Sequence, residues 1–262
     1  MKYYVVTDVH GYAEECKRAL TEKGFFEEKE PSMLVVCGDL LDRGPEAETL
    51  VEFMLDIKEQ GRLVYILGNH EDLFVDCLQA VARGDVYDIA SGLSHHYINK
   101  TWDSLLALGG MSEQEAYTQP HELVRSVMRS SFYKKLLPSA VDYFETPHYI
   151  FTHGWIPCVT KGPKPYTSYR YDPDWREADA IAWRRARWFN GMEVACKHHV
   201  AEEGKTIVCG HWHTSYGHAH LHGEGSEWGK DAVFAPFHDD GIIALDACTA
   251  YSGTVNCIVI ED

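Results

Sequence analysis

Residues 34–39 read Leu-Val-Val-Cys-Gly-Asp, a short apolar run that ends in a carboxylate. Four further runs have the same form, and each leads to a side chain that can bind a metal or a phosphate: residues 3–7 before Asp8, 63–68 before Asn69, 149–152 before His153, and 206–210 before His211. Short runs rich in Val, Ile, Tyr and Phe are typical of buried strands. In open α/β sheets, sites form beyond the carboxyl ends of the strands. We therefore expect these side chains to converge on one pocket.

The composition is that of an ordinary globular protein, and it excludes some classes of partner. The chain has 262 residues, 45% of them hydrophobic, and we expect one domain over 1–262. The formal net charge is −16 and no basic stripe is visible, so we expect no nucleic-acid partner. No apolar run is long enough for a membrane span or a secretion signal. The eight cysteines contain no Cys-x-x-Cys pair, so a reducing, cytoplasmic location is favoured over a disulfide framework.

The order of the predicted elements indicates an α/β protein. Residues 1–75 alternate strand and helix, with helices over about 13–23 and 46–59, which favours parallel pairing. A helical insertion, or cap, is expected over about 72–145, with helical pieces over 95–108 and 121–136. Prolines and tyrosines in 157–173 predict an irregular loop, followed by a helix near 174–189. Strands over 241–246 and 254–260 are expected to form a hairpin across Ser252 and Gly253.

Polar residues at the strand ends have side chains suited to metal and phosphate chemistry. Asp8 and His10 are two apart, and in extended backbone they would point to the same side. Residues 38–44 place Asp39, Asp42 and Arg43 between glycines, where the backbone can turn tightly and Arg43 offers a planar fork for phosphate. A surface ion pair is the alternative for that segment. Mixed imidazole and carboxylate ligands suit Mn, Fe, Zn, Co or Ni better than Ca or Mg.

Histidines complete this set, and each has a simpler alternative reading. His70 follows Asn69 and can act as an acid or base near neutral pH, although Asn69 alone also fits a helix N-cap. His153 follows the fourth strand, and His211 and His213 follow the fifth. An isolated histidine at a strand end is usually only hydrogen-bonded, but the match with two aspartates and an asparagine favours a metal site.

Together these motifs resemble the five blocks of the calcineurin-like metallophosphoesterases. The motifs are Asp8-x-His10, Gly38-Asp39-x-x-Asp42-Arg43-Gly44, Gly68-Asn69-His70-Glu71, His153-Gly154 and Gly210-His211-x-His213. They are similar to the phosphoprotein phosphatase branch, which also contains bacterial diadenosine tetraphosphate hydrolases. The resemblance implies a four-layer α/β/β/α sandwich, with two central mixed sheets flanked by helices and a helical insertion.

The resemblance also implies roles for individual residues and two divalent ions, with manganese favoured. One ion would be held by Asp8, His10, Asp39 and His213, and the other by Asp39, Asn69, His153 and His211. A hydroxide shared by the ions would attack phosphorus directly, with Arg43 and Asn69 on the phosphate, His70 protonating the leaving oxygen, and Asp42 orienting His70. Arg185 is the candidate for a second phosphate-binding arginine. The alternative for Arg185 is a solvated basic helix face shared with Arg184 and Arg187.

The expected substrate is a phosphorylated molecule, either a phosphoprotein or a small phosphoester or nucleotide. A serine/threonine phosphatase-like enzyme is the first hypothesis. The alternative is a symmetrical dinucleotide polyphosphate hydrolase, in which Trp155, Tyr166 and Tyr169 could form a platform for a base. An inactive metal-binding scaffold is disfavoured because His70 and Asp42 are both present. For His218, His220 and His222 a polar loop is favoured over an additional metal site, and the sequence leaves the oligomeric state open.

Overall fold

Two mixed β-sheets form the centre of the computed structural model, which describes residues 1–163, 166 and 168–262. The first sheet has the order β11-β1-β2-β3, in which β1, β2 and β3 are parallel and β11 is antiparallel at the edge. The second has the order β4-β5-β8-β10-β9, with β5, β8 and β10 parallel and an antiparallel strand at each edge. The strands are β1 (Lys2–Val6), β2 (Ser32–Cys37), β3 (Leu63–Ile66) and β11 (Ile258–Glu261) in the first sheet, and β4 (Phe144–Glu145), β5 (Tyr149–Phe151), β8 (Thr206–Cys209), β9 (Phe237–Asp239) and β10 (Ile242–Ala244) in the second.

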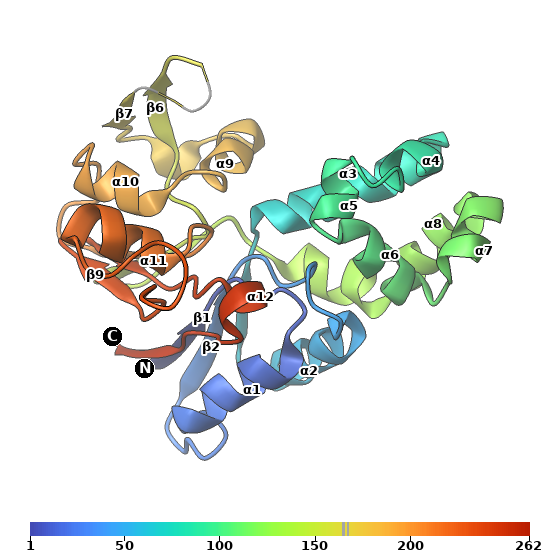
Figure 1. The fold of residues 1–262 in the computed structure, drawn as a ribbon. Coiled ribbons are helices and arrows are strands. Elements are labelled where there is room, and N and C mark those ends of the chain that lie inside the picture. The colour runs from blue at the N-terminus through green and yellow to red at the C-terminus, as the bar shows by residue number, and fades with distance from the viewer. Residues whose placement is uncertain (164–165, 167) are drawn as a thin grey trace.

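The two sheets pack face to face, with helices on their outer sides (Figure 1). Side chains alternate along a strand, so Tyr3 and Val5 of β1 pack toward the second sheet, whereas Tyr4 and Val6 pack toward the helices. The first sheet is covered by α1 (Ala13–Glu22) and α2 (Ala47–Glu59), and the second by α9 (Ala180–Ala186) and α10 (Gly191–Cys196). This arrangement confirms the predicted α/β/β/α sandwich.

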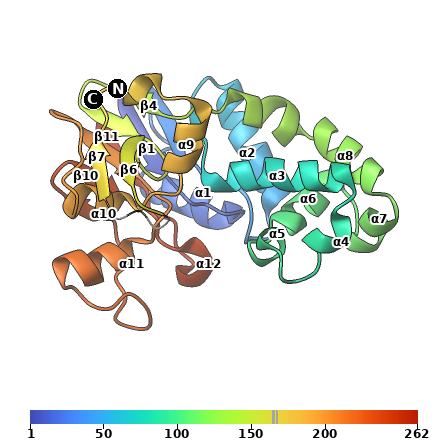
Figure 2. The same cartoon turned by 90° about the horizontal axis from the view of Figure 1, so that it is seen from above.

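Helices fill most of the chain between β3 and β4, and they extend to one side of the sheets (Figures 1 and 2). They are α3 (Asn69–Arg83), α4 (Val86–Ile89), α5 (His95–Ile98), α6 (Thr101–Gly109), α7 (Glu113–Thr118), α8 (Pro120–Arg129), η1 (Phe132–Leu136) and η2 (Leu137–Ser139). The piece predicted over 95–108 is interrupted because Lys100 has a φ of +59°. The last residues of the interval form β4, a strand that the sequence did not reveal because it is only two residues long.

Two sequence-based expectations are wrong. Residues 157–173 contain an antiparallel pair, β6 (Cys158–Lys161) and β7 (Ser168–Tyr171), because Pro157 and Pro173 flank the paired residues instead of interrupting them. The hairpin across Ser252 and Gly253 does not form. Its two strands, β10 and β11, belong to different sheets, and α12 (Thr249–Ser252) lies between them.

The remaining elements are short and connect the second sheet to its surroundings. The helix predicted over 174–189 is divided into η3 (Trp175–Glu177) and α9. After β8 come α11 (Thr214–Gly217) and the π-helical turn η4 (His218–His222). Within the described part of the chain, no helix combines the length and apolar character needed to cross a bilayer.

Candidate metal centre

The loops that follow β1, β2, β3, β5 and β8 meet where the edges of the two sheets come together. Backbone hydrogen bonds join them directly: the N–H of Asp8 donates to the carbonyl of Gly38 (3.2 Å), and the N–H of Gly210 donates to the carbonyl of His153 (2.7 Å). Residues that are far apart in the sequence, on both sheets, therefore meet at one place, as predicted from the carboxyl ends of parallel strands.

Asp39 lies at the centre of this place, between two groups of imidazoles. Its Oδ2 is 3.8 Å from Nε2 of His10 and 3.8 Å from Nε2 of His70, and its Oδ1 is 3.2 Å from Nε2 of His153. Two clusters with metal-ligand spacing share this carboxylate. One comprises His10, Asp39 and His70, and the other comprises Asp39, His153 and His211.

The hydrogen bonds of two histidines leave unprotonated nitrogens directed at this carboxylate. Nδ1–H of His10 donates to the carbonyl of Leu41 (3.0 Å), and Nδ1–H of His153 donates to the carbonyl of Cys37 (2.8 Å). Nε2 of His153 then carries a lone pair, yet it lies 2.9 Å from Oδ1 of Asn69 and 3.2 Å from Asp39. Acceptors that face each other in a buried site need either a proton or a metal ion between them, and histidines oriented by backbone carbonyls are common at metal sites. These residues therefore fit divalent ions.

The electrostatics of the buried groups agree with a site for positive charge. Burial lowers the pKa of His153, but the carboxylates of Asp39 and Asp8 outweigh it and raise that pKa to about 10. Burial raises the pKa of Asp39, yet His153 and His70 hold it well below its ordinary value. Burial, followed by repulsion from His153, lowers the pKa of His211 to about 3, so its ring is neutral and can act as a ligand.

Asp246 is a buried acidic group near this centre that the sequence analysis did not select. Burial and the Asp246 carboxylate together raise the pKa of Asp8 well above its ordinary value. The same signal that identified the other residues was available, because Asp246 follows the apolar run 242–245. Since β10 is parallel to β8, its carboxyl end reaches the same edge of the sheet.

Six site residues have left-handed backbone conformations, with φ between +49° and +74°: Asp8, His10, Asp39, Asp42, Arg43 and His211. The backbone at Asp8 and His10 is therefore not extended, so the premise from which both side chains were expected to point the same way is wrong. Residues other than glycine in this region cost about 1–3 kcal/mol each and concentrate at functional sites. The fold holds the loops in strained conformations that direct these side chains inward.

Glu71 fixes two of the loops, and Gly68 permits their close approach. The Glu71 carboxylate accepts hydrogen bonds from the N–H groups of Asp39 (3.0 Å), Leu40 (3.0 Å) and Gly68 (2.6 Å). A Cβ at Gly68 would lie 2.1 Å from Oδ1 of Asp39, so no other residue fits there without moving the central ligand. Asn69 then begins α3, with its side chain at the site rather than serving as the N-cap.

His70 is held by Asp42, and Asp42 is held by the helical segment. Nδ1 of His70 lies 2.7 Å from Oδ2 of Asp42. The hydroxyl of Thr101 donates to Oδ2 of Asp42 (2.6 Å), and the hydroxyl of Ser104 donates to Oδ1 (2.7 Å). Both hydroxyls are on α6, and sequence reasoning missed them because no motif marks them. Arg43 completes the group, with Nη2 3.3 Å from Nε2 of His70.

The predicted arginines and His213 have distinct environments. Arg185 is exposed and lines a cavity next to His211. The alternative of a shared solvated basic face is wrong for Arg187, which is buried with its Nη1 2.8 Å from both oxygens of Asp72. Among the described residues, His213 belongs to neither ligand cluster, and its Nε2 lies 3.2 Å from Oε1 of Glu227.

An aromatic cavity of about 470 Å³ lies beside His211. Trp188 and Trp212 are at its edge toward the metal centre, with ring centroids 5.7 Å and 6.0 Å from that of His211. Its lining comprises Tyr166, Tyr169, Arg185, Trp188, Phe189, Asn190, Glu193, Trp212 and Tyr216. Trp155 is not part of it. That side chain is fully buried in the core of the second sheet, so it cannot stack on a substrate.

A family model for calcineurin-like phosphoesterases matches residues 1–233. The chain belongs to this family. The resemblance read from the five motifs is thereby confirmed. In this phosphoesterase the cluster around Asp39 is the place where divalent ions are expected.

Two similar sequences are nucleotide hydrolases, and one similar solved structure is a phosphatase. A symmetrical bis(5'-nucleosyl)-tetraphosphatase of Buchnera aphidicola is 38% identical over 71 residues, which cover 27% of this chain and 24% of that protein. The asymmetrical bis(5'-nucleosyl)-tetraphosphatase PrpE of Bacillus subtilis is 32% identical over 76 residues, covering 27% and 31%. A cold-active protein-tyrosine phosphatase of a Shewanella species has a similar fold, with a TM-score of 0.52, 15% identity, and coverage of 100% of this chain and 75% of that one. The matched stretch is thus under a third of the length of either sequence relative.

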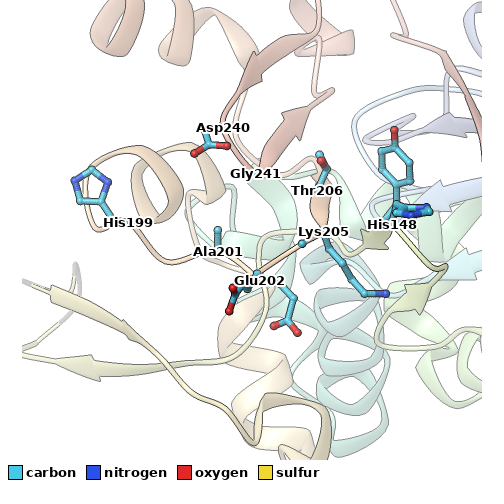
Figure 3. Close-up of a pocket in the computed structure, with 11 residues that line it drawn as sticks. His148, His199, Ala201, Glu202, Lys205, Thr206, Asp240 and Gly241 are labelled. Carbon is cyan, nitrogen blue, oxygen red and sulfur yellow. The ribbon is translucent and has the colours of Figure 1, made fainter.

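A second cavity, of about 510 Å³, is lined by Lys205 and Thr206 (Figure 3). Thr206 begins β8, so this cavity is at the opposite end of the strand from His211. Two of its charged side chains are paired, with Glu202 3.0 Å from Arg176 and Lys205 2.9 Å from Glu145. Because the cavity is at the amino end of the parallel strands, we assign it no role in the chemistry.

Proposed function

We propose that the protein is a metal-dependent hydrolase of phosphoric esters and anhydrides whose substrate is a nucleoside polyphosphate, and most specifically a dinucleotide polyphosphate. The observation that carries this proposal is the aromatic cavity beside His211. Ligand cavities of a few hundred Å³ with aromatic linings and a few polar groups are typical of sites for cofactors and nucleotides. A phosphoserine side chain would leave most of this cavity unused.

The position of the cavity suits a base joined to a phosphate chain. Trp188 and Trp212 are 37% and 38% exposed, so their faces are available for stacking. Arg185 lines the same cavity and supplies a positive charge for the phosphate oxygens of a nucleotide bound there.

At the metal centre, the position of each site residue supports a specific role. Asp39, with the surrounding imidazoles, Asp8 and Asn69, would hold two divalent ions, which would activate a water as the nucleophile and neutralise phosphate oxygens. We propose Mn²⁺ as the native ion because imidazole and carboxylate donors suit it. Asp42 accepts from Nδ1–H of His70 and stabilises the imidazolium form, whose Nε2–H would protonate the leaving oxygen. Arg43, 3.3 Å from that nitrogen, would bind the phosphate.

A substrate panel tests the proposal. The Mn²⁺-loaded protein is assayed with diadenosine tetraphosphate, a phosphoserine peptide and p-nitrophenyl phosphate. We expect kcat/KM to be greatest for the dinucleotide. A greater kcat/KM for the phosphopeptide would return the assignment to a phosphoprotein phosphatase, and no turnover of any substrate by metal-loaded protein would favour the inactive scaffold.

Replacement of Trp188 by Ala separates base recognition from phosphate chemistry. Stacking of one base on an aromatic ring contributes about 1–3 kcal/mol, so KM for the dinucleotide should rise roughly 5- to 150-fold. The kinetics with p-nitrophenyl phosphate, which has no base, should stay unchanged, and Tyr87→Ala is the matched control because Tyr87 is an exposed aromatic residue on the helical segment. Equal effects on both substrates would show that Trp188 supports the metal centre instead of a base.

A further inference from the structure

A second group of metal-binding side chains lies in and after the turn η4, outside the phosphoesterase centre. One ligand atom from each of His218, His222 and Glu224 lies within 4.8 Å of the others. Among the described residues, none of these three belongs to either cluster around Asp39. The sequence alone favours a polar loop for this stretch, because alternating histidines carry little information by themselves.

The local fold brings the three side chains together. His218 and His222 are the two ends of one π-helical turn. Gly223 follows with a φ of +69°, a left-handed conformation that reverses the chain. The N–H of Glu224 then donates to the carbonyl of His218 (2.8 Å), which returns the Glu224 carboxylate to the first histidine.

When the ring of His218 is neutral, one of its nitrogens faces an acceptor although it is itself an acceptor. Its Nε2 lies 3.2 Å from the carbonyl of Ala235, an acceptor, so Nε2 carries a proton. In the neutral ring, Nδ1 then has a lone pair, and it faces Oε2 of Glu224 at 2.9 Å. The His218 side chain is only 11% exposed, so water cannot readily separate the two acceptors. Either the ring is a cation or a metal ion replaces the missing proton.

His222 repeats this pattern. Its Nε2 lies 3.1 Å from Oδ2 of Asp239, and its ring packs on Phe237 with centroids 4.4 Å apart. Donation from Nε2–H to this carboxylate leaves Nδ1 of His222 unprotonated. A histidine that donates one N–H to a carboxylate or carbonyl and presents the other nitrogen is the usual arrangement of a metal ligand.

We propose that His218, His222 and Glu224 bind a structural divalent ion of the zinc type, separate from the catalytic ions. Two imidazoles and a carboxylate are a donor set that Zn²⁺ accepts. Tetrahedral zinc places its ligand atoms roughly 3.3–3.5 Å apart, and the three ligand atoms here, all within 4.8 Å of one another, reach that spacing with small side-chain rotations. The ion would fix the start of the segment 223–236, which carries Glu227 and Trp228 onto His213. The site thus stabilises one wall of the phosphoesterase centre without taking part in its chemistry.

Zinc content of matched variants tests this site in the full chain. Wild type, Glu224→Gln, His222→Ala and His220→Ala are stripped of metal, loaded with Zn²⁺, desalted and analysed for bound zinc. We expect Glu224→Gln and His222→Ala each to bind one equivalent less zinc than wild type. We expect His220→Ala, on the same turn but outside the cluster, to bind as much as wild type. Since the Glu224 side chain is 59% exposed, its replacement should not unfold the protein.

Two further readouts separate the proposal from its alternatives. Asp39→Asn should lose ions of the catalytic centre but keep the one equivalent of zinc bound by His218, His222 and Glu224. This result does not depend on which substrate the enzyme hydrolyses. Zn²⁺ should raise the melting temperature of Asp39→Asn, and this increase should disappear when Glu224→Gln is added. If wild type, Glu224→Gln and His222→Ala bind equal zinc, the site is an imidazolium–carboxylate cluster and the proposal is wrong.

Discussion

Replacement of Asp42 by Asn tests whether His70 is the proton donor. The substitution preserves the size of a fully buried side chain but removes the negative charge 2.7 Å from Nδ1 of His70. Although burial lowers the pKa of His70, Asp39 and Asp42 outweigh it, so this pKa is above its ordinary value. A hydrogen bond to a charged group contributes about 1.5–3 kcal/mol, and only protonated His70 gains it fully, so turnover should fall roughly 10- to 150-fold.

The pH profile gives a sharper readout than the rate alone. A general acid is active below its pKa, and its contribution is lost as pH rises through that value. Because a neutral amide at position 42 cannot stabilise the imidazolium as a carboxylate does, the basic limb of kcat should move to lower pH by about one to two pH units. Metal content and KM should change little. Asp103→Asn, an exposed substitution on α6, is the control and should leave the basic limb in place.

One outcome would refute this reasoning. If Asp42→Asn retains both metal ions and slows turnover while the basic limb stays where it is in the wild type, His70 is not the titrating acid. Loss of metal in the same variant would instead identify Asp42 and His70 as supports of the ligand cluster, which the 3.8 Å approach of His70 to Asp39 also allows.

Two further substitutions test the centre and its attachment to the helical segment. Asp39→Asn should lower metal occupancy at both positions, because this carboxylate is shared by both clusters, and elemental analysis showing unchanged occupancy would contradict its bridging role. Arg187→Ala should destabilise the protein by about 2–4 kcal/mol, because it leaves Asp72 without its buried partner. Urea unfolding measures this change in the free energy of unfolding. A loss below about 0.5 kcal/mol would show that solvent replaces the ion pair.

The five strands that lead to the site, and most of the candidate site itself, could be predicted because both depend on local sequence. A buried strand is recognised by its apolar run, and parallel pairing brings the residues just beyond each strand to one edge of the sheet. Asp8, Asp39, Asn69, His153 and His211 were all found in this way. Applied once more, the same rule would have found Asp246.

Other features depend on tertiary packing, which no local pattern encodes. The hydroxyls of Thr101 and Ser104 reach Asp42 only because α6 packs against the loop after β2. The burial of Trp155 and the ion pair of Arg187 also arise from contacts between distant elements. The hairpin predicted across Ser252 was wrong because adjacency in the sequence does not decide which sheet a strand joins.

The left-handed residues of the centre have a consequence for evolution and engineering of the protein. Selection for thermal stability alone should favour Gly at Asp39, Asp42 and Arg43, since Gly adopts positive φ without the steric penalty. Each such exchange would relieve strain and remove a side chain on which hydrolysis depends. A library of variants selected only for thermal stability should therefore accumulate Gly at these positions and lose activity. Selection for both stability and hydrolysis should leave the three residues unchanged.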